Sequence, residues 1–253
     1  TKSRYKLACE CPTKLYYTRK DEYANSKMND PFLEALADGG YQVGELAKQY
    51  FPGGHDIRSL DYKEAEKQTN ELLKQENVII FEPAIRFNNL FIRIDVLVKK
   101  GNHFDLIEVK AKSFDINNDS FFGKKGGLDS NWKPYLYDVA FQNHVLANAF
   151  PDAKISNYLM LADKNAKCAT DGLNQKFRIT RDTNDRKGIS VHHSLTEADL
   201  AHWVLVKVPV DDAIDHIKSH INSSGRSFSD EIEYFAAAYE HDSKIRPTIG
   251  RHC

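Results

Sequence analysis

The chain has 253 residues, of which 41% are hydrophobic, and a formal net charge of −1. This length can bury a large core, and the balanced charge argues against a broad basic surface that grips duplex nucleic acid. No apolar run reaches the roughly 18 residues that a membrane span needs, and Thr1 to Lys20 lacks the apolar run of a signal peptide. We therefore expect a soluble cytoplasmic protein without a membrane partner.

Helices are expected in the first third of the chain. The segment from Pro31 to Tyr50 begins with a proline that suits a first helical turn, and its apolar residues recur at helical spacing after Gly39-Gly40. We expect the glycine pair to break this helix or to allow a close approach. A more polar helix is predicted from Tyr62 to Lys74.

The middle of the chain is rich in Ile, Val and Phe, which indicates strands joined by short turns at Asn88-Asn89 and around Gly101-Asn102. The predicted elements are strands at Val78 to Phe87, Leu90 to Lys99 and His103 to Ala111, a loop from Phe114 to Pro134, a helix from Tyr135 to Phe150 and a strand from Ile155 to Ala162. Further on we expect a strand at Phe177 to Thr183, a strand or transition at Asp199 to Val210, and helices from Thr196, at Asp211 to Ser223 and at Ser229 to Glu240.

Two opposite charges interrupt the strand FDLIEVKAKS. Because strand side chains alternate between faces, Glu108 and Lys110 lie on the same face as the apolar residues Phe104 and Leu106. An isolated ion pair on an exposed sheet face is one reading of this pattern, and it would contribute little stability. A functional site is the other reading.

The predicted turns bring more acids to this face. If Asn88-Asn89 is a two-residue turn, Glu82 lies opposite Asp95. If Val98 pairs with His103 in the second hairpin, Asp95 lies across from Leu106 and diagonal to Glu108. Carboxylates crowded in this way repel one another unless a cation compensates them, and oxygen ligands without Cys or His favour Mg²⁺ or Mn²⁺ over zinc.

The segment IDVLVKKGNHFDLIEVKAKS, from Ile94 to Ser113, resembles the Asp-(x)n-Glu-x-Lys signature of the PD-(D/E)XK nuclease superfamily. Phe141-Gln142 is similar to the glutamine motif of RecB-type nucleases, although Leu146 stands where a Tyr is expected. Gly40 to Glu45 resembles the helix before the meander. The resemblance implies an α/β fold with a restriction-endonuclease-like core, in which helices flank a central mixed sheet with a three-strand antiparallel meander.

The resemblance also implies roles for individual residues. Asp95, Glu108 and the Val109 backbone carbonyl would hold Mg²⁺ or Mn²⁺, and Glu82 or Glu45 would complete the shell, with neither preferred. Lys110 would orient the attacking water or stabilise the developing charge on the phosphate, and Gln142 would bond the nucleotide or the water. The aromatic residues in and after the loop could stack on bases or could equally anchor the loop to the core; they are Phe121, Phe122, Trp132 and Tyr135.

Lys2-Ser-Arg-Tyr and Cys11-Pro-Thr-Lys-Leu-Tyr-Tyr resemble the start of CRISPR-associated RecB-like exonucleases and of a related uncharacterised bacterial family. In these proteins an early Cys joins three C-terminal Cys around an iron-sulfur cluster. The resemblance implies that Cys11 and Cys253 are ligands of a [4Fe-4S] cluster, with the others beyond Cys253. Two unrelated thiols are the alternative.

Together these features predict one nuclease domain over residues 1–253, with a core at about 31–163 and elaborations at 1–30 and 164–253. The expected activity is metal-dependent hydrolysis of phosphodiester bonds in DNA, as an exonuclease on single-stranded ends. The alternatives are a module that keeps the nuclease fold and binds nucleic acid without cutting it, and an interaction or cluster-bearing fragment of a larger assembly.

Overall fold

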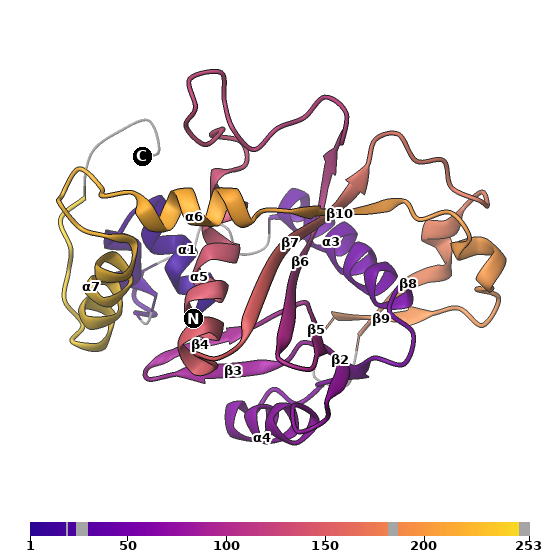
Figure 1. Ribbon diagram of the computed structural model, residues 1–253, viewed down its shortest axis with the longest axis horizontal. Coiled ribbons are helices and arrows are strands. Elements are labelled where there is room, and N and C mark those ends of the chain that lie inside the picture. The colour runs from indigo at the N-terminus through magenta and orange to yellow at the C-terminus, as the bar shows by residue number, and fades with distance from the viewer. Residues whose placement is uncertain (19, 24–29, 182–186, 248–253) are drawn as a thin grey trace.

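The computed structural model describes residues 1–18, 20–23, 30–181 and 187–247. Within these residues a mixed sheet of six strands forms the centre of an α/β fold, flanked by helices (Figure 1). In spatial order its strands are β1 (His55–Asp56), β2 (Asn77–Phe81), β5 (Val96–Lys100), β6 (His103–Phe114), β7 (Lys154–Asp163) and β10 (Leu205–Pro209).

The strands β2, β5 and β6 form an antiparallel meander, as the sequence predicts. β6 then pairs with β7 in parallel, and the connection between them contains helix α5 (Lys133–Ala149). A parallel pair needs such a crossover, because a short turn can only reverse the chain. β10 adds to the far edge by pairing antiparallel with β7, and β1 pairs in parallel with β2.

Each face of the sheet is covered by a different helix (Figure 1). Leu106 of β6 belongs to a buried cluster with Val139 and other residues of α5. Its neighbour Ile107 points to the opposite face and packs with Leu46 of α3 (Pro31–Gln49). The helix α3 runs without interruption through Gly39-Gly40, so the expected break is wrong; its Asp30 cap and its apolar face outweigh the low helix propensity of two glycines.

The first two predicted strands are each divided in two. β2 ends at Phe81, because Glu82 adopts a φ of 54° and is followed by Pro83, which has no N–H to donate. The chain then forms a separate hairpin of β3 (Ala84–Phe87) and β4 (Leu90–Arg93) before β5 begins. The predicted turn and register are confirmed, since Phe87 pairs with Leu90 and the N–H of Glu82 donates to the carbonyl of Asp95 at 3.2 Å.

The predicted register of the second hairpin is wrong by two residues. Lys100 pairs with His103, so the turn consists of Gly101 and Asn102, and Gly101 has the positive φ of 56° that such a turn requires. Val96 consequently pairs with Ile107. Continuing this register places Asp95 directly opposite Glu108 instead of Leu106. A shift of two residues leaves every side chain on its predicted face.

The remaining elements surround this sheet. They are α1 (Lys2–Glu10), α2 (Thr13–Tyr17), α4 (Tyr62–Leu72), β8 (Phe177–Arg181), β9 (Lys187–Val191), α6 (Asp211–Ser219), α7 (Phe228–Glu240) and two 3₁₀ turns at Leu173–Lys176 and Glu197–Leu200. The helices α1 and α2 are absent from the sequence prediction. Tyr5 of α1 stacks on Phe141 of α5, with 4.6 Å between ring centroids, so the N-terminal segment is part of the main core. Over the described ranges, no helix has the length and apolar character to cross a membrane.

Candidate active site

Glu108 lies at the centre of a charged cluster between β6 and α5. Its side chain is fully buried, and Lys110, two residues along the same face, bonds to its Oε1. Asp95, the residue before β5, accepts a hydrogen bond from the N–H of Val109 at 2.7 Å. Strand alternation and the two turns thus bring together the three residues of the predicted signature, Asp95, Glu108 and Lys110.

The Glu108 carboxylate has three donors. In addition to Lys110, Gln142 of α5 donates its Nε2–H to Oε2 at 2.8 Å, and the Nζ of Lys2 lies 3.0 Å from both oxygens. Burial alone would raise the pKa of this carboxyl, but the ammonium groups of Lys110 and Lys2 hold the pKa of Glu108 well below its usual range. The side chain is therefore a carboxylate at neutral pH.

Asp138 is a site residue that the sequence analysis did not identify. Its Oδ2 lies 3.5 Å from Lys110 Nζ, and burial, followed by the nearby Glu108 carboxylate, raises the pKa of Asp138 to about 7. Asp138 precedes Gln142 by four residues on α5, which places both on one helical face. That spacing was the signal that could have found it.

Lys2 is the second site residue missing from the prediction. Its ammonium bonds to Glu108 and lies 3.8 Å from Asp95 Oδ1. Burial lowers the pKa of Lys2, but the Glu108 and Asp95 carboxylates outweigh this effect and raise the pKa above its ordinary value. No local sequence pattern predicts this role for Lys2, because the role depends on how α1 packs against α5.

The two candidates for an additional acid differ in position. Glu82 lies beside Asp95, and burial together with the Asp95 charge raises the pKa of Glu82 to about 7; its Oε2 is 3.6 Å from Arg93 Nε. Glu45 lies on α3, which covers the opposite face of the sheet, and its carboxylate is 3.3 Å from Lys48 Nζ. The structure therefore brings Glu82, and not Glu45, to the edge of the cluster.

The donor set fits a hard divalent cation. Mg²⁺ commonly binds to only one or two protein carboxylates and keeps several waters. Asp95, just before β5, and Glu108 of β6 supply two carboxylates. Asp138 Oδ1 and Gln142 Oε1 are buried without a hydrogen-bond partner among the described residues, so the cluster has further acceptor oxygens to offer. In the same residues no group of three or more His, Cys, Asp or Glu is arranged as a metal site.

The other predicted residues lie away from this cluster or cannot be placed. Cys11 is a half-buried free thiol on the connection between α1 and α2, and Cys253 lies outside the described residues, so the iron-sulfur cluster stays a prediction. Of the loop aromatics, Phe121 and Trp132 are buried and pack edge to face in the main core. They are core residues, so of the two readings of the loop aromatics the structure favours core anchoring for Phe121 and Trp132.

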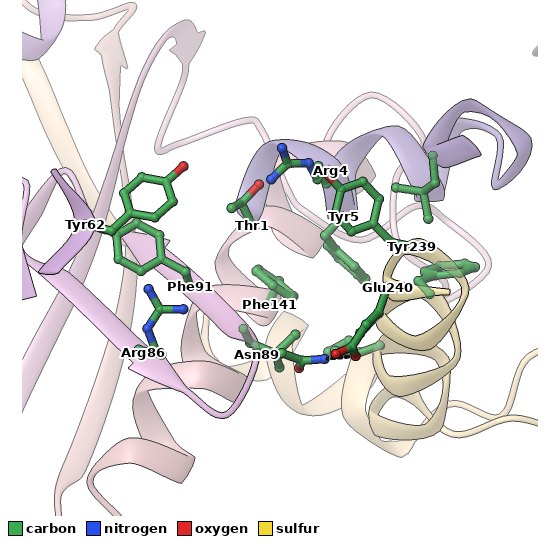
Figure 2. Close-up of a pocket in the computed structure, with 15 residues that line it drawn as sticks. Thr1, Arg4, Tyr5, Tyr62, Arg86, Asn89, Phe91, Phe141, Tyr239 and Glu240 are labelled. Carbon is green, nitrogen blue, oxygen red and sulfur yellow. Dashed lines mark hydrogen bonds between the residues drawn. The ribbon is translucent and has the colours of Figure 1, made fainter. Parts of the chain in front are cut away.

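A cavity of about 300 Å³ lies beside α1 and reaches Thr1, the residue before Lys2 (Figure 2). On one side the guanidinium of Arg86 lies over the ring of Phe91, which stacks on Tyr62 at 4.4 Å between centroids. On the other side the guanidinium of Arg4 lies 4.6 Å from the centre of the Tyr239 ring. The cavity thus combines cationic groups with aromatic surfaces.

Comparison of the chain with protein-family models, with curated proteins and with solved structures finds no match. The functional interpretation therefore depends on the geometry of the cluster itself.

Proposed function

We propose that the protein is a metal-dependent nuclease of the PD-(D/E)XK type that hydrolyses phosphodiester bonds in DNA. The observation that carries this proposal is the position of Asp95, which precedes β5 and accepts a hydrogen bond from Val109 N–H, next to Glu108 and Lys110 on one face of β6. The three-strand meander, the helix α5 and the parallel strand β7 follow one another in the order expected for the restriction-endonuclease-like core.

The residues of the cluster would have different roles in the reaction. Asp95 and Glu108 would hold Mg²⁺ or Mn²⁺, which when bound polarises the phosphate and lowers the pKa of a coordinated water. Lys110 carries a positive charge beside these carboxylates, where it can orient the water or stabilise negative charge on the phosphate. Gln142 fixes the Glu108 carboxylate from the α5 side and keeps its Oε1 available as an acceptor.

The cavity beside α1 is the place that we propose for a single-stranded end of the substrate. Base faces stack on aromatic rings and phosphates pair with guanidinium groups, and the cavity contains groups of both kinds. Arg86 is paired with Glu66 at 2.6 Å and lies over Phe91, and Arg4 lies over Tyr239, so a nucleotide would bind by displacing these partners. The volume of the cavity suits about one nucleotide rather than a duplex. We therefore favour an exonuclease that acts on single-stranded ends.

One observation favours a second candidate, a module that binds nucleic acid without cutting it. Lys2 already neutralises Glu108 and lies near Asp95, so a protein without metal would have a compensated cluster. The buried oxygens of Asp138 and Gln142 that lack partners favour the nuclease. Unsatisfied buried acceptors cost free energy, and a site that binds no metal would have no compensation for that cost.

The test is a cleavage assay on linear single-stranded DNA, on the matching duplex and on circular single-stranded DNA, with Mn²⁺ or with EDTA. We expect cleavage of the linear single strand in Mn²⁺, none in EDTA, resistance of the circle, and loss of cleavage in Asp95→Asn. Binding to DNA without cleavage in Mg²⁺ or Mn²⁺ would support the non-cleaving alternative. Cleavage of the circle would exclude a purely exonucleolytic mode.

A further inference from the structure

The ammonium of Lys2 lies beside the two carboxylates that are expected to bind the metal ion. It lies 3.0 Å from both oxygens of Glu108 and 3.8 Å from Asp95 Oδ1, so one cation already serves both carboxylates of the expected metal site. Two carboxylates of a metal site share a divalent ion in the same manner. An ammonium and a hydrated cation cannot both occupy the space between them.

The helix that carries Lys2 is firmly placed. Tyr5, three residues further along α1, is buried, stacks on Phe141 and meets Phe228 of α7 edge to face. The charges of the cluster hold the Lys2 ammonium in place. The four-carbon stem of Lys2 is flexible, so the ammonium can move away while α1 stays docked. Movement of this one side chain can therefore open the site.

We propose that the Lys2 ammonium is a built-in competitor for the metal ion, which the ion must displace from Asp95 and Glu108 when it binds. This inference rests on the proposed metal site and extends it with a switch between two cations. The metal-free cluster is neutralised and stable, and the apparent metal affinity is lowered by the fraction of molecules in which Lys2 blocks the site. If Lys2 is displaced in only a tenth of the molecules, the apparent dissociation constant rises about tenfold.

The first experiment measures Mn²⁺ affinity by calorimetry for the wild type, Lys2→Met and the control Lys6→Met, in the absence of DNA. Lys6 lies on the same helix but is exposed, so its replacement removes the same charge without touching the cluster. We expect Lys2→Met to bind Mn²⁺ at least about tenfold more tightly than the wild type, and Lys6→Met to match the wild type. Equal or weaker binding in Lys2→Met would overturn the proposal.

A second measurement uses only the wild type, in case Lys2→Met does not fold. Acylation by acetic anhydride, followed by mass spectrometry, reports the reactivity of each lysine with and without saturating Mg²⁺. We expect Lys2 to be protected without metal and labelled several-fold faster with Mg²⁺, while Lys6 labels equally in both. Unchanged or slower labelling of Lys2 with Mg²⁺ would overturn the proposal.

These outcomes are separable from those of the nuclease assay. Tighter Mn²⁺ binding by Lys2→Met without any cleavage of DNA would leave the cation exchange standing and reject the nuclease. If the wild type cleaves DNA and Lys2→Met binds Mn²⁺ with the same affinity, the nuclease is supported and the cation exchange is rejected. Failure of both proteins to bind Mn²⁺ or Mg²⁺ would reject both proposals.

Discussion

The ammonium of Lys2 lies 3.0 Å from both carboxylate oxygens of Glu108, although 106 positions separate the two residues in the sequence. The same carboxylate also accepts hydrogen bonds from Lys110 and Gln142. A fully buried acid with two cations and an amide around it costs free energy to assemble, so replacing the acid or a neighbouring charge has measurable consequences.

Lys110→Met is expected to reduce the rate of DNA cleavage by at least about 100-fold, because the positive charge near the developing phosphate charge is lost. Lys112→Met is the matched control, since Lys112 lies two residues further along β6 and bonds to the carbonyl of Asn131, outside the cluster. The measurement is the initial cleavage rate in Mn²⁺. A Lys110→Met protein that cuts as fast as the control would remove Lys110 from the mechanism.

Glu108→Gln is expected to lower the free energy of unfolding of the metal-free protein by about 3–5 kcal/mol, because it leaves two ammonium groups with a weaker partner in a buried position. Urea denaturation in EDTA measures this loss. The control is Glu71→Gln, which removes an exposed partner of Lys74 and should change stability by less than about 1 kcal/mol. Equal stability of the two variants would show that the Glu108 cluster is not a tight, buried network.

Asp138 predicts a pH dependence of stability. Its pKa is about 7 in the folded protein, above the value of about 4 for an unfolded aspartate, so the protonated form is favoured by folding. The resulting stabilisation is fully present below about pH 4 and is lost as the pH rises through 7, at up to about 1.4 kcal/mol per pH unit.

Asp138→Asn isolates this contribution, because the amide cannot titrate. In urea denaturation without metal, the wild type should lose stability relative to Asp138→Asn between pH 4 and pH 7. Parallel pH profiles of the two proteins would be inconsistent with a raised pKa at Asp138.

Glu82 and Glu45 are expected to affect metal binding differently. Glu82→Gln should weaken Mn²⁺ affinity by about tenfold, because Glu82 lies next to Asp95 and adds negative charge at the edge of the cluster. Glu45→Gln should change it by less than about twofold, since Glu45 pairs with Lys48 over the other face of the sheet. Calorimetry with Mn²⁺ compares the two, and a larger effect at Glu45 would reverse the assignment.

Much of the central cluster follows from local rules. Strand alternation places Glu108 and Lys110 on one face, and the two-residue turn at Asn88-Asn89 sets Glu82 against Asp95. The second hairpin is harder to predict, because several registers around Gly101 leave the alternation of faces intact. The observed one depends on a positive φ at Gly101, which the sequence permits but does not require.

The contact of the N-terminal segment with the cluster cannot be predicted from residue spacing within that segment. Lys2 reaches Glu108 because the ring of Tyr5 stacks on that of Phe141, which is a contact between distant parts of the chain. Nothing in the spacing of residues within α1 specifies that partner. Asp138 is an intermediate case, since its helical spacing from Gln142 was visible but its proximity to Lys110 required the packing of α5 on β6.

The most direct test of the central claim is an anomalous difference map from crystals soaked in Mn²⁺. We expect a peak between the carboxylates of Asp95 and Glu108, with the Lys2 ammonium moved away from both. Metal-saturated crystals without a peak there, in which Lys2 still contacts Glu108, would contradict the claim.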